Sequence, residues 1–145
     1  MKKIVLITGG NKGIGKAISI ELAKQGYFIC VNYKTDKKSA IRVINSINKN
    51  GGNAIEIQAD ISIEKEVTKL FDTIDKIDGT LVGLINNAAI LGEQSCLAEM
   101  STNRVIKTFN TNIIGTIFDY LCSLYCAIGQ DYEKYLYDWY WFNWR

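Results

Sequence analysis

The sequence predicts an α/β fold in which a parallel β-sheet carries helices on both faces. Short runs rich in β-branched and other apolar residues recur along the chain, at residues 4–7, 27–33, 54–58 and 81–85. Each run is followed by a stretch in which apolar residues recur at helical spacing. Strand–helix alternation of this kind builds a parallel sheet, because right-handed crossovers return each new strand beside an earlier one.

The first strand leads into a glycine turn and then a helix within residues 4–15, IVLITGGNKGIG. Gly9, Gly13 and Gly15 are spaced one residue wider than the usual G-x-G-x-x-G pattern. Glycines permit close approach and positive φ, and the free N–H groups at a helix N-terminus attract anions. The segment therefore predicts a phosphate-binding turn; the alternative is a tight strand–helix connection without a ligand.

Each predicted helix has one apolar stripe. Gly26 is the expected stop of the first helix, and Ser62 is placed to cap the third, with Glu64 and Glu66 in its first turn. The expected stripes are Ile14, Ala17, Ile18, Leu22 and Ala23; Ala40, Ile41, Ile44 and Ile47; Val67, Leu70, Phe71 and Ile74; and, in a helix from about Thr102, Val105, Ile106, Phe109 and Ile113.

Polar residues follow three of the predicted strands. The glycine turn follows the first strand, Asp60 comes just after the third, and Asn86 and Asn87 end the fourth. The carboxyl ends of parallel strands meet at one edge of the sheet, where such folds bind ligands. The sequence therefore predicts a ligand site at that edge.

The composition is that of one ordinary globular domain, with 145 residues, 48% hydrophobic, 22% charged and a net charge of +2. So small a charge gives no electrostatic case for nucleic acid, and no apolar run approaches the roughly 18 residues of a membrane span. A cytoplasmic location is expected. Without His, the four cysteines offer no metal-ligand pattern and are expected to be buried thiols, and every mechanism with a histidine base is excluded.

Four spaced motifs carry a resemblance to a known family: TGGNKGIG at 8–15, DIS at 60–62, NNA at 86–88 and NIIG at 112–115. In this order and spacing they resemble the short-chain dehydrogenase/reductases, over about residues 3–118. In detail the chain looks like the bacterial 3-oxoacyl-carrier-protein reductases. The resemblance implies a Rossmann fold and hydride transfer between NAD(P) and a small carbonyl or alcohol substrate.

The resemblance also implies roles for single residues. The three glycines surround the pyrophosphate, Asp60 lies against the adenine ring, and Asn87 and Ala88 back the adenosine ribose. Asn112 matches the family's catalytic asparagine, which kinks its helix and holds a water in the proton relay. The cofactor-binding residues expected on this basis are Thr8, Gly9, Asn11, Gly13, Ile14, Gly15, Asp60, Ile61, Asn87 and Ala88.

Charge indicates which dinucleotide is preferred. NAD-binding Rossmann folds place a carboxylate at the end of the second strand, whereas NADP binders supply a cation. Residues 31–34, VNYK, contain no acid, and Asp36 is expected to cap the next helix. Lys12 and Lys34 can both meet a 2′-phosphate, so NADP(H) is predicted over NAD(H). The alternative is that both lysines are solvated surface charges.

The chain departs from the family pattern after about Gly115. The family's catalytic Tyr-x-x-x-Lys pair and Ser have no match there; the one such spacing, Tyr33–Lys37, lies on the adenosine side. Residues 116–145 instead hold 11 of the 16 aromatic residues. Residues 1–118 are therefore predicted to be an incomplete NAD(P)-binding Rossmann domain, and residues 119–145 an aromatic tail outside the family pattern. The tail has two explanations, a truncating frame shift or a genuine short protein.

Three functions stay open on this evidence. The chain is an NADP-dependent oxidoreductase by ancestry, a non-catalytic dinucleotide-binding fragment or pseudoenzyme, or an interaction protein that uses its aromatic tail and an exposed sheet edge. The edge would be residues 81–85, which favour self-association, and residues 135–144 are rich enough in aromatics to pair with it.

Overall fold

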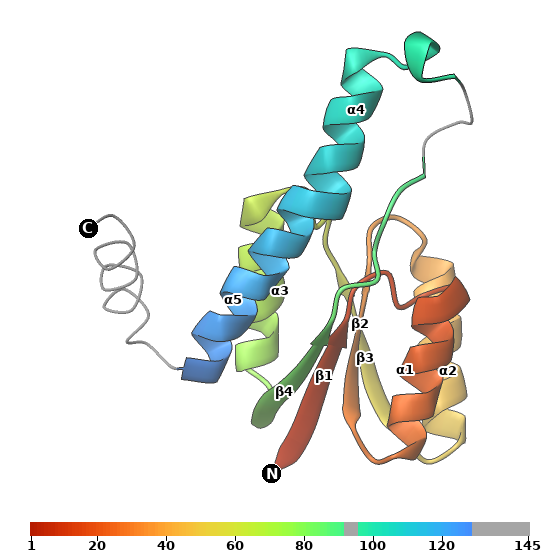
Figure 1. Cartoon of the computed structure of the whole chain (residues 1–145). Helices are drawn as coiled ribbons and strands as arrows, with labels where there is room; N and C mark the ends of the chain where they lie inside the picture. Colours follow the sequence, from red (N-terminus) through yellow and green to blue (C-terminus); the bar gives the residue numbers. More distant parts are fainter. Residues whose placement is uncertain (92–95, 129–145) are drawn as a thin grey trace.

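The computed structural model describes residues 1–91 and 96–128, and it contains a four-stranded parallel sheet (Figure 1). All four predicted strands form, in the spatial order β3-β2-β1-β4. Their bounds are β1 (Lys2–Ile7), β2 (Phe28–Tyr33), β3 (Asn53–Gln58) and β4 (Gly79–Ile85).

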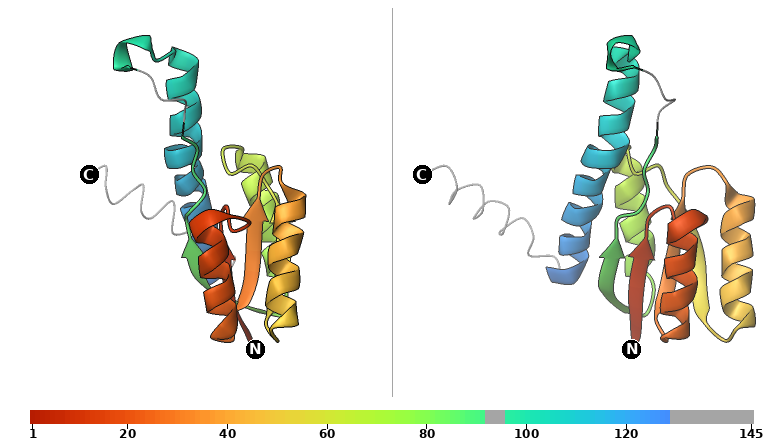
Figure 2. Two further views of the ribbon diagram at one scale, coloured as in Figure 1. Left: turned by 90° about the vertical axis from the view of Figure 1, so that its right-hand side faces the viewer. Right: turned by 45° about the vertical axis from the view of Figure 1, so that its right-hand side comes forward.

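Helices cover both faces of this sheet, which confirms the predicted α/β Rossmann-type class (Figures 1 and 2). On one face lie α1 (Gly13–Lys24) and α2 (Lys37–Lys49), and on the other α3 (Glu64–Asp75) and α5 (Thr116–Ile128). The chain runs outward from β1 to β3 and then crosses to β4 on the other side of β1. The strand order therefore reverses at β1, and open α/β sheets bind ligands beside such a reversal.

The core consists of two apolar layers, one on each face of the sheet. Successive side chains of a strand point to opposite faces. Val5 and Ile7 of β1 therefore pack with the buried residues of α1 and α2, while Ile4 and Leu6 pack with those of α3.

The predicted stripe of α1 is confirmed only in part, since Ile18 and Leu22 pack partly buried against the core and Ala23 is buried. Gly15, Ser19 and Ala23 face the sheet, whereas Ile14 is 74% exposed and Ala17 is also exposed. Small residues allow α1 to lie close to the sheet, and the Ser19 hydroxyl is satisfied by donating to the Gly15 carbonyl oxygen at 2.8 Å. A pattern read from hydrophobicity alone misses a stripe selected for small size.

Two smaller corrections concern α2 and α3. In α2, Val43 is buried where Ile41 had been expected, and Ile41 is 38% exposed. The apolar stripe of α3 is confirmed, but its cap is not: α3 has Ile63 as N-cap, and the Ser62 hydroxyl donates instead to Asp60 Oδ1 at 2.7 Å. The competing Asp60 carboxylate explains why Ser62 does not cap the helix.

The fourth helical stretch begins at Thr102 as predicted and is not uniform. The Ser101 hydroxyl caps α4 (Thr102–Phe109), a π-helical turn η2 (Asn110–Gly115) follows, and α5 continues from it. A short 3-10 turn, η1 (Leu97–Glu99), precedes α4. The expected apolar stripe is not buried here, since Ile106, Phe109 and Ile113 are 50%, 54% and 44% exposed.

Within the described strands β4 is an edge, because it pairs with β1 alone. The expected pairing of residues 135–144 with this edge lies outside the described residues. In the part of the chain that the structure covers, no helix is both long and apolar enough for a membrane span.

The cysteines match the expectation of buried thiols only in part. Cys30 is fully buried, and burial raises the pKa of its thiol to about 12. Cys122 and Cys126 are half-buried on α5, whereas Cys96 is exposed.

Asp119 of α5 is a carboxyl group that is buried without a hydrogen bond from any described residue. Its side chain is 0% exposed, and neither carboxylate oxygen has a hydrogen-bond partner among the described residues. Burial disfavours the charged form and raises the pKa of Asp119 to about 7, from an ordinary value of 3.8.

This carboxyl group makes stability depend on pH. Between the two pKa values the folded chain holds a proton that the unfolded chain releases, so the free energy of unfolding falls as pH rises from about 4 to about 7. The loss is on the order of 4 kcal/mol. We expect Asp119→Asn to remove this decline and to be clearly more stable than the unsubstituted chain at pH 8, but not below about pH 4, where the carboxyl group is protonated in both states.

Urea unfolding at several pH values measures the effect. Asp78→Asn, at an exposed position, is the matched control and should keep the decline. If the free energy of unfolding of Asp119→Asn still falls with pH as steeply as that of the unsubstituted chain, a group other than Asp119 causes the decline.

Candidate nucleotide-binding site

A cleft of about 320 Å³ lies at the carboxyl ends of the strands. Ile7 is level with Val31 and Ile85, and Tyr33 with Gln58, so the segments that follow the strands leave the sheet at one edge. The predicted site residues that line the cleft are Gly9, Asn11, Lys12, Lys34, Asp60, Ile61, Asn87 and Ala88. Its other wall residues are Asn32, Thr35, Asp36, Ala59, Ala89, Ile90 and Thr111.

The glycine turn has backbone that glycine adopts without strain, since φ is +61° at Gly9 and +55° at Gly13. A Cβ on Gly9 would lie 3.0 Å from Ala88 Cα, whereas Gly13 faces open space. α1 begins at Gly13 with Lys12 as N-cap; none of the described side chains caps it, and its first turn has no acidic residue. Its first N–H groups, including that of Ile14, are therefore available to an anion.

Thr8 and Asn87 hold this turn against the end of β4. The buried Thr8 hydroxyl accepts from the N–H groups of Asn87 and Ala88, both at 3.0 Å, and donates to the Ile85 carbonyl oxygen at 3.4 Å. Asn87 Nδ2 donates to the carbonyl oxygens of Thr8 and Gly9, at 2.9 and 3.2 Å. A hydroxyl has one donor and two acceptor sites. Thr8 therefore positions the cleft and has no hydrogen-bonding capacity left for a ligand.

Asn32 also fixes the glycine turn, from the side of β2, and it is not among the site residues that the sequence predicts. It lies in β2, is 2% exposed, and its Oδ1 accepts from the Gly9 N–H at 3.3 Å. Its Nδ2 donates to the Ala59 carbonyl oxygen at 3.0 Å, so Asn32 ties the turn to the end of β3. The available signal was a lone amide in an otherwise apolar strand, because a buried polar group requires partners.

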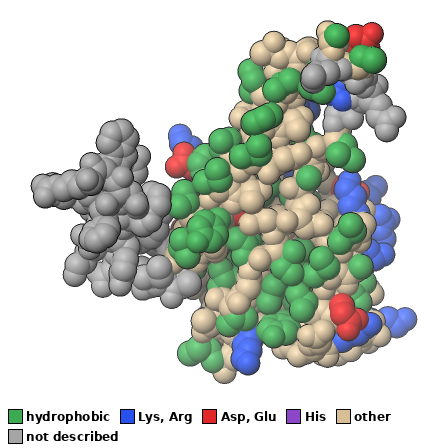
Figure 3. All heavy atoms as spheres, viewed as in Figure 1, with side chains coloured by type: hydrophobic (Ala, Val, Ile, Leu, Met, Phe, Trp, Pro, Cys, Tyr) green, Lys and Arg blue, Asp and Glu red, His purple; other side chains and the backbone are tan. Residues whose placement is uncertain are grey.

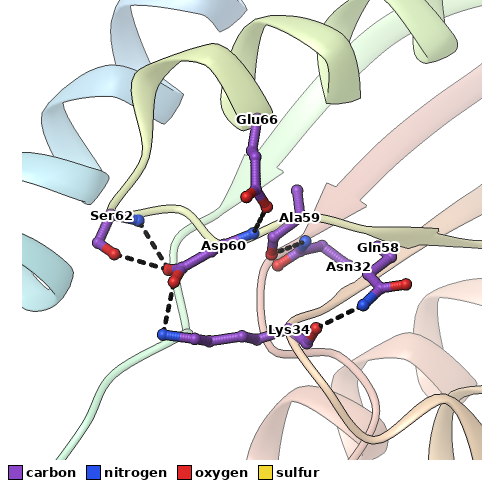
Figure 4. A network of polar contacts seen from close by, with 7 residues as sticks. All are labelled: Asn32, Lys34, Gln58, Ala59, Asp60, Ser62 and Glu66. Atoms are coloured by element: carbon purple, nitrogen blue, oxygen red, sulfur yellow. Dashed lines mark hydrogen bonds and ion pairs between the residues drawn. The ribbon is translucent and has the colours of Figure 1, made fainter.

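Asp60 is the centre of a polar network at the end of β3 (Figure 4). Ser62 donates to Oδ1 through its N–H at 3.1 Å and its hydroxyl at 2.7 Å, and the Lys34 ammonium forms an ion pair with Oδ2. Glu66 accepts from the Asp60 N–H at 2.7 Å. Partial burial acts to raise the pKa of Asp60, but the hydrogen bonds from Lys34 and Ser62 outweigh it and hold that pKa below its usual value.

Asp36 caps α2, as the sequence predicts. Its carboxylate accepts from the Ser39 N–H at 3.0 Å and hydroxyl at 2.7 Å. These hydrogen bonds, together with the charges of Lys12 and Arg42, hold the pKa of Asp36 below its usual value. Asn11 contacts the same residue, donating to its carbonyl oxygen at 3.3 Å.

Asn112 lies in η2 and reaches across to the segment that follows β4. Its Oδ1 accepts from the Ile90 N–H at 2.9 Å, and its Nδ2 donates to the Ile90 carbonyl oxygen at 3.0 Å. Its own carbonyl oxygen accepts from the Thr116 hydroxyl at 3.1 Å. The amide therefore holds a wall residue of the cleft in place from a π-helical turn, a feature that often marks functional sites. The role in a proton relay stays a prediction.

These features fit an NAD(P) dinucleotide. The open N-terminus of α1, the positive-φ glycines and Lys12 suit a pyrophosphate, and the cleft continues past the ends of β2 and β3. The fold and the place of the cleft are those of the Rossmann type, the class in which such clefts bind dinucleotides.

Comparison with known proteins identifies the family. The family model for short chain dehydrogenases matches residues 3–122. YusS of Bacillus subtilis, a short-chain dehydrogenase/reductase homolog, is 44% identical over 90 residues, which are 62% of this chain and 83% of YusS. This chain belongs to the short-chain dehydrogenase/reductase family, and is an oxidoreductase by ancestry.

Two further relatives show how much of the family the chain spans. YgfF of Escherichia coli, an uncharacterized oxidoreductase, is 41% identical over 112 residues, which are 77% of this chain and 45% of YgfF. The crystal structure of a Burkholderia cenocepacia short chain dehydrogenase in complex with NADP matches with a TM-score of 0.81 and 31% identity, covering 86% of this chain and 51% of that one. This chain therefore spans about half the length of both proteins.

Close packing at the glycine turn can be tested by adding one methyl group. A Cβ on Gly15 would lie 2.6 Å from the Gly9 carbonyl oxygen and 2.5 Å from Asn87 Nδ2. We expect Gly15→Ala to lower the free energy of unfolding by about 1–3 kcal/mol, because the backbone must shift to relieve the overlap. Gly83→Ala is the control, since the nearest atom to its Cβ would be at 3.4 Å. Urea unfolding compares the two; equal stability would contradict the close approach.

Proposed function

We propose that the cleft binds NADP(H), and that it derives by ancestry from enzymes that carry out the family's hydride transfer between NADP and a small carbonyl or alcohol compound. The observation that carries the proposal is the glycine turn, where the uncapped N-terminus of α1 adjoins a cleft that also holds Lys12 and Lys34. When bound, the nicotinamide ring supplies or accepts the hydride.

The residues of the cleft divide into contacts and supports. Gly13, Ile14 and Gly15 would hold the pyrophosphate through backbone N–H groups, and Lys12 would add a positive charge beside it. Gly9, whose N–H is taken by Asn32, would let the turn approach the pyrophosphate closely. Asp60 and Ile61 would contact the adenine ring, and Asn87 and Ala88 would lie behind the adenosine ribose, while Asn11 holds the turn. Asn112 is the proposed catalytic residue, at the end of the cleft where Ile90 lies.

The preference for NADP(H) over NAD(H) rests on charge. β2 carries no carboxylate, and Asp36, which follows it, has both carboxylate oxygens bonded to Ser39 as the cap of α2. Lys12 and Lys34 both line the cleft. The NADP complex of the Burkholderia cenocepacia relative is in keeping with this choice.

For a polypeptide of these 145 residues we expect dinucleotide binding without turnover. The single Tyr-x-x-x-Lys spacing in the sequence is Tyr33–Lys37, and Tyr33 is 3% exposed within β2. Such a polypeptide is a non-catalytic dinucleotide-binding module, the second of the functions left open by the sequence. A cytoplasmic location stays a prediction.

The nucleotide preference is tested by titrating the chain with NADPH and with NADH and following the fluorescence of the reduced nicotinamide. We expect Lys12→Ala combined with Lys34→Ala to lower the ratio of NADPH to NADH affinity by about tenfold or more, because hydrogen bonds to charged groups are worth about 1.5–3 kcal/mol. Lys69→Ala combined with Lys76→Ala removes two exposed lysines near α3 and should leave the ratio unchanged. An unchanged ratio in the first variant would refute the proposed role of both lysines.

The same samples distinguish binding from catalysis. NADPH oxidation with a panel of small aldehydes and ketones should stay at the rate without protein. Turnover above that rate would show that the 145 residues form a complete active site.

We also propose self-association as a second candidate function. It is favoured by the exposed side of β4, where Val82 is 49% exposed, and by the apolar residues along α4, η2 and α5. Figure 3 shows hydrophobic side chains spread along these three helical segments on one face of the molecule. An apolar edge strand without a neighbour is a template for pairing with another chain.

Sedimentation velocity tests the role of the β4 edge. We expect Val82→Lys to shift the chain toward monomer, because a charge on an edge strand opposes pairing. Ile41→Lys on α2, at 38% exposure, is the matched control. Identical sedimentation of the two variants and the unsubstituted chain would exclude the edge as the interface.

A further inference from the structure

The adenosine side of the cleft contains balanced charge. Its walls include two lysines, Lys12 and Lys34, and two carboxylates, Asp36 and Asp60. The two acids lie in the same cleft as the lysines, so a carboxylate can compete with a bound phosphate for a lysine.

Asp60 is the carboxylate that engages a lysine directly. The Lys34 ammonium is paired with Oδ2 of Asp60, while Oδ1 is held by the N–H and hydroxyl of Ser62 (Figure 4). Asp36 differs, because its oxygens accept from Ser39 at the start of α2. Of the two acids, Asp60 therefore controls how available Lys34 is.

The two partners of this ion pair are unequally fixed. The Asp60 side chain is 14% exposed and is bonded to Ser62, and its backbone N–H is held by Glu66. The Lys34 side chain is 50% exposed on a flexible stem. A ligand that competes for the pair can draw Lys34 away but cannot move Asp60.

We infer that Asp60 limits the preference of this cleft for a phosphorylated adenosine ribose, because it sequesters Lys34 and leaves a fixed negative charge where a 2′-phosphate would bind. The inference rests on the proposed function. A 2′-phosphate must share Lys34 with Asp60 or displace it, and it also meets the repulsion of the carboxylate. A free 2′-hydroxyl meets neither cost, so Asp60 acts on the choice between NADP and NAD.

The opposite role is physically possible and predicts the opposite sign. If Asp60 served to position Lys34 for the phosphate, neutralising Asp60 would weaken phosphate binding. Any contact between Asp60 and the adenine ring affects both nucleotides alike, so the ratio of their affinities cancels it.

The test uses two probes that occupy only the adenosine side, 2′,5′-ADP and 5′-AMP. Their dissociation constants are measured by isothermal titration calorimetry on the full 145-residue chain and on Asp60→Asn, Lys34→Gln and the double variant. We expect Asp60→Asn to raise the ratio of 2′,5′-ADP to 5′-AMP affinity by about tenfold, and by clearly less in the Lys34→Gln background. The increase should shrink at high salt.

Two further variants keep the test decisive. Asp60→Ser also removes the charge but retains an oxygen that can accept from the Ser62 N–H, so the result does not depend on Asp60→Asn folding. Glu64→Gln, an exposed residue in the first turn of α3, removes the same charge without touching Lys34 and should change the ratio less than twofold. Circular dichroism confirms that each variant is folded.

The outcomes separate this inference from the proposed function. If the unsubstituted chain binds neither probe, the proposed function fails and the inference fails with it. If both probes bind but neutralising Asp60 leaves the ratio unchanged or lowers it, the inference alone is overturned. If neutralising Asp60 raises the affinity ratio equally with and without Lys34, sequestration of Lys34 is refuted. Only the repulsion between Asp60 and the 2′-phosphate then explains the increase.

Discussion

The close approach of the glycine turn to the end of β4 is the constraint on which the rest of the site depends. β1 and β4 are far apart in the sequence, and the single Thr8 hydroxyl joins their ends through three hydrogen bonds. The approach is possible because Gly9 and Gly15 have no side chain where Asn87 and Ala88 pack. Buried polar groups that are fully satisfied fix one geometry, whereas a partly satisfied set would be costly. The N-terminus of α1 is therefore held beside the reversal of strand order, where a ligand can reach it.

The same principle continues around the sheet edge. Asn32 links the turn to the end of β3, and Asn112 links η2 to the segment after β4. Each amide uses both its donor and its acceptor on backbone groups. These side chains add to the backbone hydrogen bonds that continue past the strand ends, such as that from the Ala59 N–H to the Tyr33 carbonyl oxygen at 3.0 Å. The side chains that position the cleft therefore have their hydrogen bonds satisfied within the protein and need none from a ligand. The groups left for the ligand are backbone N–H donors and the charged side chains at the mouth.

Elements whose cause is local could be predicted from the sequence, and those that depend on distant packing could not. The four strands, the start of α4 and the Asp36 cap follow from local composition and turn chemistry. Gly15 and Ser19 on the buried face of α1 do not follow from a hydrophobic pattern, because their small size against the sheet is what places them there, and Ser62 does not cap α3 because Asp60 competes for its hydroxyl. The residues of the site were identified mainly by their order and spacing. Their division into supports and contacts required the hydrogen bonds, which no periodicity reveals.

The charges at the mouth illustrate the limit of reasoning from residue types. Lys34 and Asp60 were assigned to different parts of the cofactor, one to the ribose phosphate and one to the adenine ring, yet in the fold they are partners. The parallel register makes them so, because β2 and β3 are adjacent and Tyr33 is level with Gln58, which places the residues that follow both strands side by side. A cation that lines a cleft therefore attracts a phosphate only to the extent that its own counter-ion releases it. If the cleft binds the proposed nucleotide, its selectivity would be a property of this ion pair, and neither member would determine it alone.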